Sequence, residues 1–136
     1  MTVWQRGVET AEVVAPFPQR LVVTALGGSV GTPPEGIAAP VVELASLEAL
    51  EEALKADPDA VRGKIVFFDR RTVKDPAGPG YGKNVPMRTS GPAKAGAHGA
   101  LAVLVRSVGT DSSRFAHPGS TNYEEGKPRI PAAAVS

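Results

Sequence analysis

Short apolar runs alternate along the chain with clusters of Pro, Gly and charged residues, a pattern typical of many short strands. The runs at residues 65–68 and 100–105 are apolar throughout and predict buried strands. Residues 21–26 form another compact run, which predicts a single buried strand. A strand is also expected at 37–44, where Pro40 would confine it to a sheet edge or a bulge. Further strand candidates lie at 8–14 and 130–135.

The clearest helix is predicted directly after the strand at 37–44. Ser46 is a suitable N-cap for the sequence LEALEEALKA, because its hydroxyl can accept a hydrogen bond from the first helical turn. Leu47, Leu50 and Leu54 share one face of this helix. The Asp-Pro pair at 57–58 ends it.

A second helix is predicted at residues 88–98, with Ala93 and Ala97 at helical spacing and Gly99 as a C-terminal stop. It stands between the strands at 65–68 and 100–105. The order strand, helix, strand predicts one right-handed crossover that joins two parallel strands.

Composition describes an ordinary single domain, with 136 residues, 42% apolar and 21% charged. A net charge of +1 argues against a general nucleic-acid binder. The chain has no Cys, which excludes a disulfide, a thiolate zinc site and a Cys nucleophile. No apolar run reaches the length of a membrane span, and residues 1–20 do not resemble a signal peptide.

Three motifs then match a known family in order and spacing. The string RGKIVFF at 62–68 resembles the signature of protease-associated domains, in which Gly-Lys precedes an apolar strand. AKAGAHGA at 93–100, followed by LAVLV, is similar to that family's helix-to-strand element. IPAAAVS at 130–136 resembles its closing strand. The segment 106–123 is similar to the version in zinc-dependent aminopeptidases and carboxypeptidases related to plasma glutamate carboxypeptidase.

The resemblance implies an α+β, β-rich fold: a swivelling β/β/α domain, built as a small barrel or sandwich of about seven strands flanked by two or three helices. Residues 16–136 would form the protease-associated domain, a fragment of a larger peptidase. Residues 1–15 would be an N-terminal strand or a linker from the neighbouring domain. Many members of the family have cysteines after the first strand, and their absence here removes a covalent constraint without changing the expected fold.

Small residues within these motifs are expected to have packing roles. Gly96, Ala97 and Gly99 would let the second helix lie close to the strand that follows it, since larger side chains would separate them. Gly63 would permit a tight entry into the strand at 65–68.

Residues for catalysis are scarce. His98 and His117 are the two histidines of the chain, and a hydrolytic metal site needs three or four converging ligands. His98 is expected to be a surface or capping residue near a helix end. His117 shares a loop with Asp111 and several serines, but no G-x-S-x-G nucleophile elbow is present. We therefore expect no catalytic residue, no metal ligand and no cofactor in this chain; the resemblance places zinc in the catalytic domain of the parent protein.

Function is expected to reside in two long loops, 75–87 and 106–129, since loops of this length in a small domain are often functional. The resemblance implies that the domain rims the active-site cleft, with the peptidase domain of the same chain and a peptide substrate as partners, in a secreted or periplasmic protein. Arginine would suit a substrate carboxylate because its planar fork binds one bidentately. The candidate contacts are Tyr81, Asn84, Arg88, Arg106, Ser107, Thr110, Asp111, Arg114 and His117.

Two alternatives remain open from the sequence. The chain could be a free-standing module that binds a protein or peptide, as sorting-receptor relatives do; a zinc-ligand motif downstream of Ser136 would argue for the peptidase instead. It could also be a phosphohistidine carrier on a similar swivelling fold, with His98 or His117 as the carrier. Neither histidine lies in a recognisable carrier motif.

Overall fold

The computed structural model describes residues 4–5, 7–69, 85–107 and 119–136. Its main feature is a five-stranded sheet in the order β3-β7-β6-β5-β4. Strands β4, β5, β6 and β7 are parallel to one another, whereas the edge strand β3 is antiparallel to β7. The strands span β3 (Val23–Ala25), β4 (Val41–Leu44), β5 (Ile65–Phe68), β6 (Ala102–Arg106) and β7 (Ala132–Val135).

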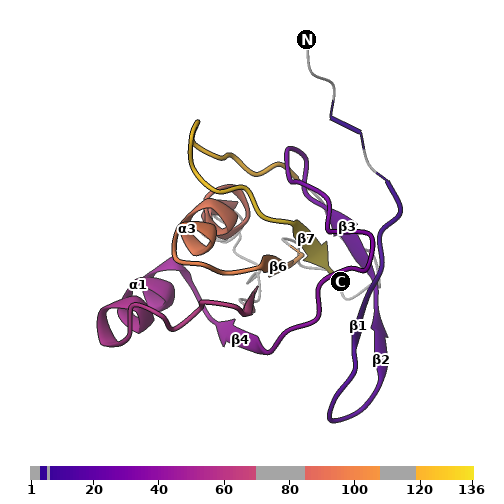
Figure 1. Cartoon of the computed structure of the whole chain (residues 1–136), viewed down its shortest axis with the longest axis horizontal. Helices are drawn as coiled ribbons and strands as arrows, with labels where there is room; N and C mark the ends of the chain where they lie inside the picture. The colour runs from indigo at the N-terminus through magenta and orange to yellow at the C-terminus, as the bar shows by residue number, and fades with distance from the viewer. Residues whose placement is uncertain (1–3, 6, 70–84, 108–118) are drawn as a thin grey trace, which may run out of the picture.

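A separate antiparallel hairpin precedes this sheet. It consists of β1 (Ala11–Val13) and β2 (Gln19–Leu21), which pair only with each other in the named sheets. Figure 1 shows the hairpin extending away from the helices. Two named helices, α1 (Leu47–Ala56) and α3 (Gly91–Ala97), lie on one side of the main sheet, and residues 85–89 add a short helical segment before α3.

The core lies between the helices and one face of the main sheet. Alternate residues of β5 and β6, two of the three inner strands, are buried, which is the pattern expected where one face of a strand is covered. Leu50 from α1 and Ala95 from α3 complete the same cluster. The sheet residues of this cluster are Val66, Phe68, Val103, Val105, Ala132 and Ala134.

Helix α1 forms as the sequence predicts. Ser46 Oγ accepts a hydrogen bond of 3.0 Å from Ala49 N, which satisfies one of the free amides of the first turn. Leu50 is 1% exposed, and Leu47 and Leu54 pack against the core from the same face. The helix ends at its C-cap, Asp57.

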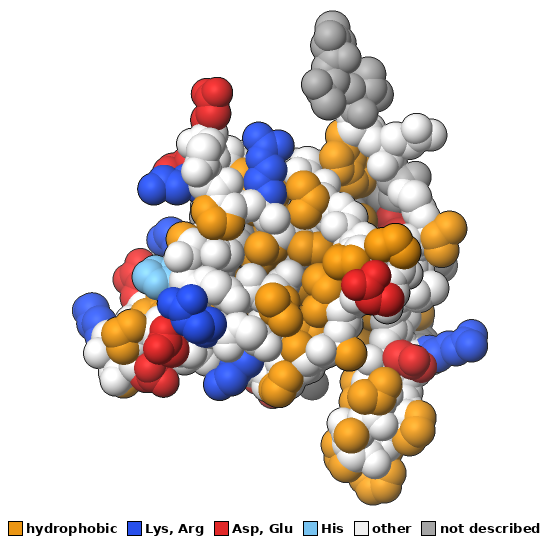
Figure 2. Space-filling view, in the orientation of Figure 1, with side chains coloured by type: hydrophobic (Ala, Val, Ile, Leu, Met, Phe, Trp, Pro, Cys, Tyr) orange, Lys and Arg blue, Asp and Glu red, His pale blue; other side chains and the backbone are white. Residues whose placement is uncertain are grey.

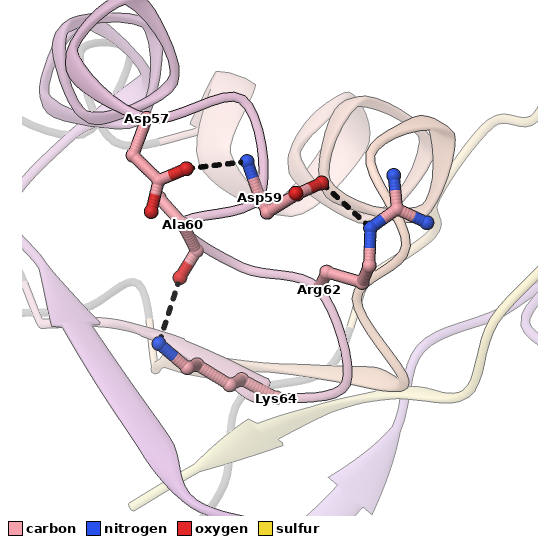
Figure 3. A network of polar contacts seen from close by, with 5 residues as sticks. All are labelled: Asp57, Asp59, Ala60, Arg62 and Lys64. Carbon is pink, nitrogen blue, oxygen red and sulfur yellow. Dashed lines mark hydrogen bonds and ion pairs between the residues drawn. The ribbon is translucent and has the colours of Figure 1, made fainter.

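The connection from α1 to β5 is held by a local polar network (Figure 3). Asp57 Oδ1 accepts from Asp59 N at 2.9 Å, and Asp59 Oδ1 accepts from Arg62 Nε at 2.7 Å. Gly63, at a φ of 69°, then donates its N–H to the Gly99 carbonyl at 2.9 Å. Gly99 has a φ of 88°, so both turns need glycine, and the bond between them places the starts of β5 and β6 side by side.

The expected fold class is confirmed. The described residues contain seven strands in two sheets with flanking helices, an α+β arrangement without a closed barrel in this part of the chain. The parallel pair β5–β6 with a helix between them is also as predicted. Pro40 directly precedes β4, which is an edge strand. Within the described residues, no helix combines the length and apolar character needed to cross a membrane.

Two local predictions are wrong. The run at 21–26 is not one strand: Leu21 ends β2 and Val23 begins β3, which lie in different sheets. In α3 the buried face consists of Gly91, Pro92, Ala95 and Gly96, whereas Ala97 is exposed. Ala97 therefore has no role in holding the helix close to the sheet.

Candidate functional site

From the set of candidate contacts, the structure describes Arg88, Arg106 and Ser107. Arg106 and Ser107 lie together at the carboxyl end of β6, and Arg88 lies in the helical segment 85–89. The remaining candidates, Tyr81, Asn84, Thr110, Asp111, Arg114 and His117, lie outside the described residues.

Arg106 is fixed by its position in the sheet. Phe68 and Val105 are register partners in the parallel pair β5–β6, so the next residues, Asp69 and Arg106, are neighbours. Arg106 Nη1 forms an ion pair with Asp69 Oδ1, and the two side chains are 36% and 25% exposed. A charge-assisted contact between partly buried groups orients the guanidinium, so Arg106 is an anchored cation at this edge.

Ser107 is held by the neighbouring strand. Its backbone N–H donates to the Val135 carbonyl at 2.8 Å, and its Oγ donates to the same carbonyl at 2.7 Å. The hydroxyl proton is therefore engaged with backbone, which is a structural role at the junction of β6 and β7.

Glu43 joins Asp69 and Arg106 at this edge of the sheet. A hydrogen bond with Asp69, together with the negative charge of Asp69, raises the pKa of Glu43 above its ordinary value, and the positive charge of Arg106 opposes this. Sequence reasoning missed both acids. The available signal was that Glu43 lies near the end of one predicted strand and Asp69 directly follows another.

Arg88 has a different environment. Its side chain covers Gly119, where a Cβ atom would collide with Arg88 Nε and Cζ, so a larger residue at position 119 would displace the Arg88 side chain. The Nε atom is buried and has no hydrogen-bond partner among the residues that the structure describes. A buried polar group without a partner is costly, and the cost is relieved when a ligand or a neighbouring group accepts the hydrogen bond.

Backbone contacts bring three distant segments together around Arg88. Gly27 N donates to the Gly119 carbonyl at 2.7 Å, and Thr121 N donates to the Gly27 carbonyl at 2.9 Å. On the other side, Thr89 O accepts from Asn122 N at 2.9 Å and from Thr121 Oγ1 at 3.2 Å. The residues that follow the two undescribed segments, 85–89 and 119–122, are thus adjacent.

No metal site is found in the described ranges. No group of three or more His, Cys, Asp or Glu side chains there is arranged to hold a metal ion. His98 is exposed and forms the C-cap of α3, with its backbone N–H bonded to the Ala95 carbonyl. The described residues therefore do not offer a ligand set that fits zinc.

Curated relatives match nearly the whole chain. No family model matches it. Carboxypeptidase Q from Pongo abelii is 37% identical over 133 residues, and the human protein is 36% identical over the same length. The rat protein is 39% identical. Each match covers 98% of this chain and 26% of the relative, so the chain spans about a quarter of the length of these relatives.

Solved structures agree. A peptidase M28 precursor from Shewanella amazonensis aligns with a TM-score of 0.92 and 44% identity, over 98% of this chain and 30% of the other. BSAP, a zinc aminopeptidase from Bacillus subtilis, aligns with a TM-score of 0.58 and 18% identity, over 97% and 26%, which shows a shared fold alone. The resemblance seen in the sequence is thereby confirmed: the chain is similar to one segment of zinc exopeptidases of the carboxypeptidase Q and M28 type, and its fold fits a protease-associated domain.

Proposed function

We propose that this chain is a non-catalytic accessory domain of a longer zinc metallo-exopeptidase. In that protein it rims the active-site cleft and controls substrate access or binds the end group of the substrate. The observation that carries the proposal is the extent of the match: 98% of this chain corresponds to 26% of carboxypeptidase Q. A segment of that size leaves most of the relative's length for a peptidase domain.

The other parts of the proposal follow from the same resemblance. The zinc ions and the general base would belong to the peptidase domain, which is the partner of this domain within one polypeptide. Residues 16–136 would form the accessory domain, and residues 1–15 a strand or linker from the neighbour. The protein would be secreted or periplasmic.

Arg88 is the described candidate that best supports substrate binding. Its buried Nε has no hydrogen-bond partner within the described part of the chain, and its guanidinium lies beside the junction of 85–89 with 119–122. A planar guanidinium binds a carboxylate through two parallel hydrogen bonds. We assign Arg88 to the free carboxylate of a peptide substrate. The cleft would be completed by Tyr81, Asn84, Arg106, Ser107, Thr110, Asp111, Arg114 and His117.

The test compares substrates with and without a terminal carboxylate. In the full-length peptidase, Arg88→Ala should raise KM for a dipeptide with a free carboxylate about tenfold or more, since hydrogen bonds to charged groups contribute about 1.5–3 kcal/mol. The KM for the amidated dipeptide should hardly change. Arg88→Lys should rescue part of the loss, because it keeps the charge but not the fork.

Arg62→Ala is the matched control. Arg62 is exposed and paired with Asp59 in the turn before β5, so its removal should leave both substrates unaffected. Equal KM values for Arg88→Ala and the unmodified enzyme with the free-carboxylate substrate would reject the assignment of Arg88. An equal loss with both substrates would indicate that Arg88 is only structural.

A further inference from the structure

The tip of the β1–β2 hairpin exposes a run of apolar residues. Residues 14–18 read Val-Ala-Pro-Phe-Pro, and all of them are exposed. Val14 is 68% exposed and Phe17 is 78% exposed. In Figure 2 the tip forms an apolar lobe that projects from the lower right of the body.

Such a tip is unfavourable in water. Turns are normally rich in Gly, Pro, Asn, Asp and Ser, so Pro16 and Pro18 are ordinary turn residues, whereas the exposed side chains of Val14 and Phe17 are not. A run of consecutive exposed apolar residues is expected only where it has a function. The hairpin also has a sheet of its own with the register pairs Ala11–Leu21, Glu12–Arg20 and Val13–Gln19. Two-stranded hairpins are marginally stable by themselves, so a surface that covers the tip would stabilise this one beyond its connection to β3 at Val22.

Charge argues against a lipid surface as that partner. Glu12 lies directly opposite Arg20 across the hairpin, so the two charges offset one another. Binding to an anionic membrane requires an excess of Lys and Arg beside the apolar residues.

Size argues against a second copy of the chain. A stable interface between separate proteins buries about 800 Å² on each partner, which takes about 20–30 residues. A tip formed by residues 14–18 is much smaller. A small apolar contact suffices, however, when both surfaces belong to one polypeptide, because the tether supplies a high effective concentration.

We propose that the tip, residues 14–18, docks into an apolar hollow on the peptidase domain of the same polypeptide. This rests on the proposed function, which supplies that domain: the chain spans 26% of its carboxypeptidase Q relatives, and the rest of their length is available as the partner. The proposed boundary between the two domains, after residue 15, falls within the hairpin. Strand β1 precedes this boundary and would belong to the segment from the neighbouring domain, whereas β2 follows it and would belong to the accessory domain. The hairpin is thus a docking arm that fixes the angle between the two domains.

Photo-crosslinking in the full-length protein tests the docking directly. p-Benzoylphenylalanine at position 17 replaces one aromatic ring by another and should form a crosslink within one polypeptide, to residues outside these 136. The same probe at position 52, where Glu52 is exposed on α1, is the control and should give no such product. A crosslink from position 17 to a second copy or to lipid, or no crosslink, overturns the proposal.

A second variant measures the consequence for domain coupling. Phe17→Ser in the full-length protein should separate the thermal unfolding of this domain from that of the peptidase domain, so that one transition becomes two. Glu52→Ser should leave the transition unchanged. Unaltered unfolding of Phe17→Ser would count against the docking arm. The outcome is distinct from that of the Arg88 experiment, which reports on substrate binding and does not depend on the hairpin.

Discussion

Gly91 and Phe68 approach so closely that a Cβ atom at position 91 would lie 2.8 Å from Cε2 of the phenyl ring. Phe68 is fully buried at the end of β5, and Gly91 opens α3. The absence of a side chain at position 91 therefore sets how closely α3 lies on the main sheet, and the helical segment that carries Arg88 directly precedes this contact.

Gly91→Ala is expected to destabilise the chain by about 1–3 kcal/mol, because the added methyl group overpacks a filled core. Thermal or urea unfolding of the purified chain measures the loss. Gly31→Ala is the control, since nothing lies within 4 Å of a Cβ at Gly31. Its stability should be unchanged or slightly higher, and equal stabilities of the two variants would contradict the close approach.

Tyr123 is expected to make the native chain less stable at high pH. Burial raises its pKa to about 12, although the charge of Arg129 opposes the shift, and its hydroxyl donates a hydrogen bond to the Ile130 carbonyl. The native chain thus keeps a proton that the unfolded chain loses near pH 10. The stability that this proton contributes is complete below about pH 10 and is lost as pH rises toward about 12.

Two measurements check this prediction. Ultraviolet titration of the phenolate should show a tyrosine with a pKa near 12 in the native chain. Tyr123→Phe should cost about 0.5–1.5 kcal/mol at neutral pH through the lost hydrogen bond, and its stability should depend less on pH between about 10 and 12. If both tyrosines of the native chain titrated near pH 10, Tyr123 would not be shielded by burial.

The Glu43–Asp69 pair is expected to make the stability of the chain depend on pH in the acidic range. The hydrogen bond with Asp69 raises the pKa of Glu43, so protonated Glu43 stabilises the native chain. This contribution to stability is complete below the ordinary pKa of 4.5 and is lost as pH rises through the native pKa. Glu43→Gln resembles the protonated form at every pH. The variant should therefore match the parent chain in acid and melt at a higher temperature near neutral pH.

Glu35→Gln controls for the loss of one negative charge, since Glu35 is exposed in the loop before β4. Its difference from the parent chain should not grow over the same pH range. A Glu43→Gln variant whose melting temperature parallels that of the parent at every pH would contradict the coupling of Glu43 to Asp69.

Local signals carried most of the fold prediction. Helix α1 was predictable because its N-cap, its apolar face and its stop all lie close together in the sequence, within positions 46–58. The strands β5 and β6 were predictable because they are continuous apolar runs. The division of 21–26 was not, because it depends on β3 pairing with β7, more than a hundred residues away, while β2 pairs within the hairpin.

The pairing register of the strands explains why the cluster of Glu43, Asp69 and Arg106 was predicted only in part. Composition marked Arg106 as a cation on a long loop, but its partner Asp69 is identified only when Phe68 is paired with Val105. The contact between Arg88 and Gly119 has no signal in the sequence. One residue precedes β6 and the other follows it, and the tertiary fold alone brings them together. The buried face of α3 was misplaced because Gly and Ala give almost no hydrophobic periodicity.

Ser46→Ala is expected to cost about 1 kcal/mol, because it leaves the Ala49 amide without the hydroxyl that caps it. Chemical unfolding measures the change. Ser120→Ala is a suitable control because Ser120 is exposed and lies outside a helix. A cost no larger than that of the control would mean that the cap contributes nothing to α1.

The purified chain should hydrolyse no aminoacyl or dipeptide substrate when zinc is added. Each zinc ion of a co-catalytic centre needs three or four converging ligands. The chain has two histidines and no cysteine. The described residues contain no group of three acidic or histidine side chains that could substitute for them. The assay compares product release with and without zinc, and the longer protein that we propose as the parent of this chain serves as the positive control. Sustained zinc-dependent turnover by these 136 residues alone would require ligands and a base within the chain, and the accessory role would have to be abandoned.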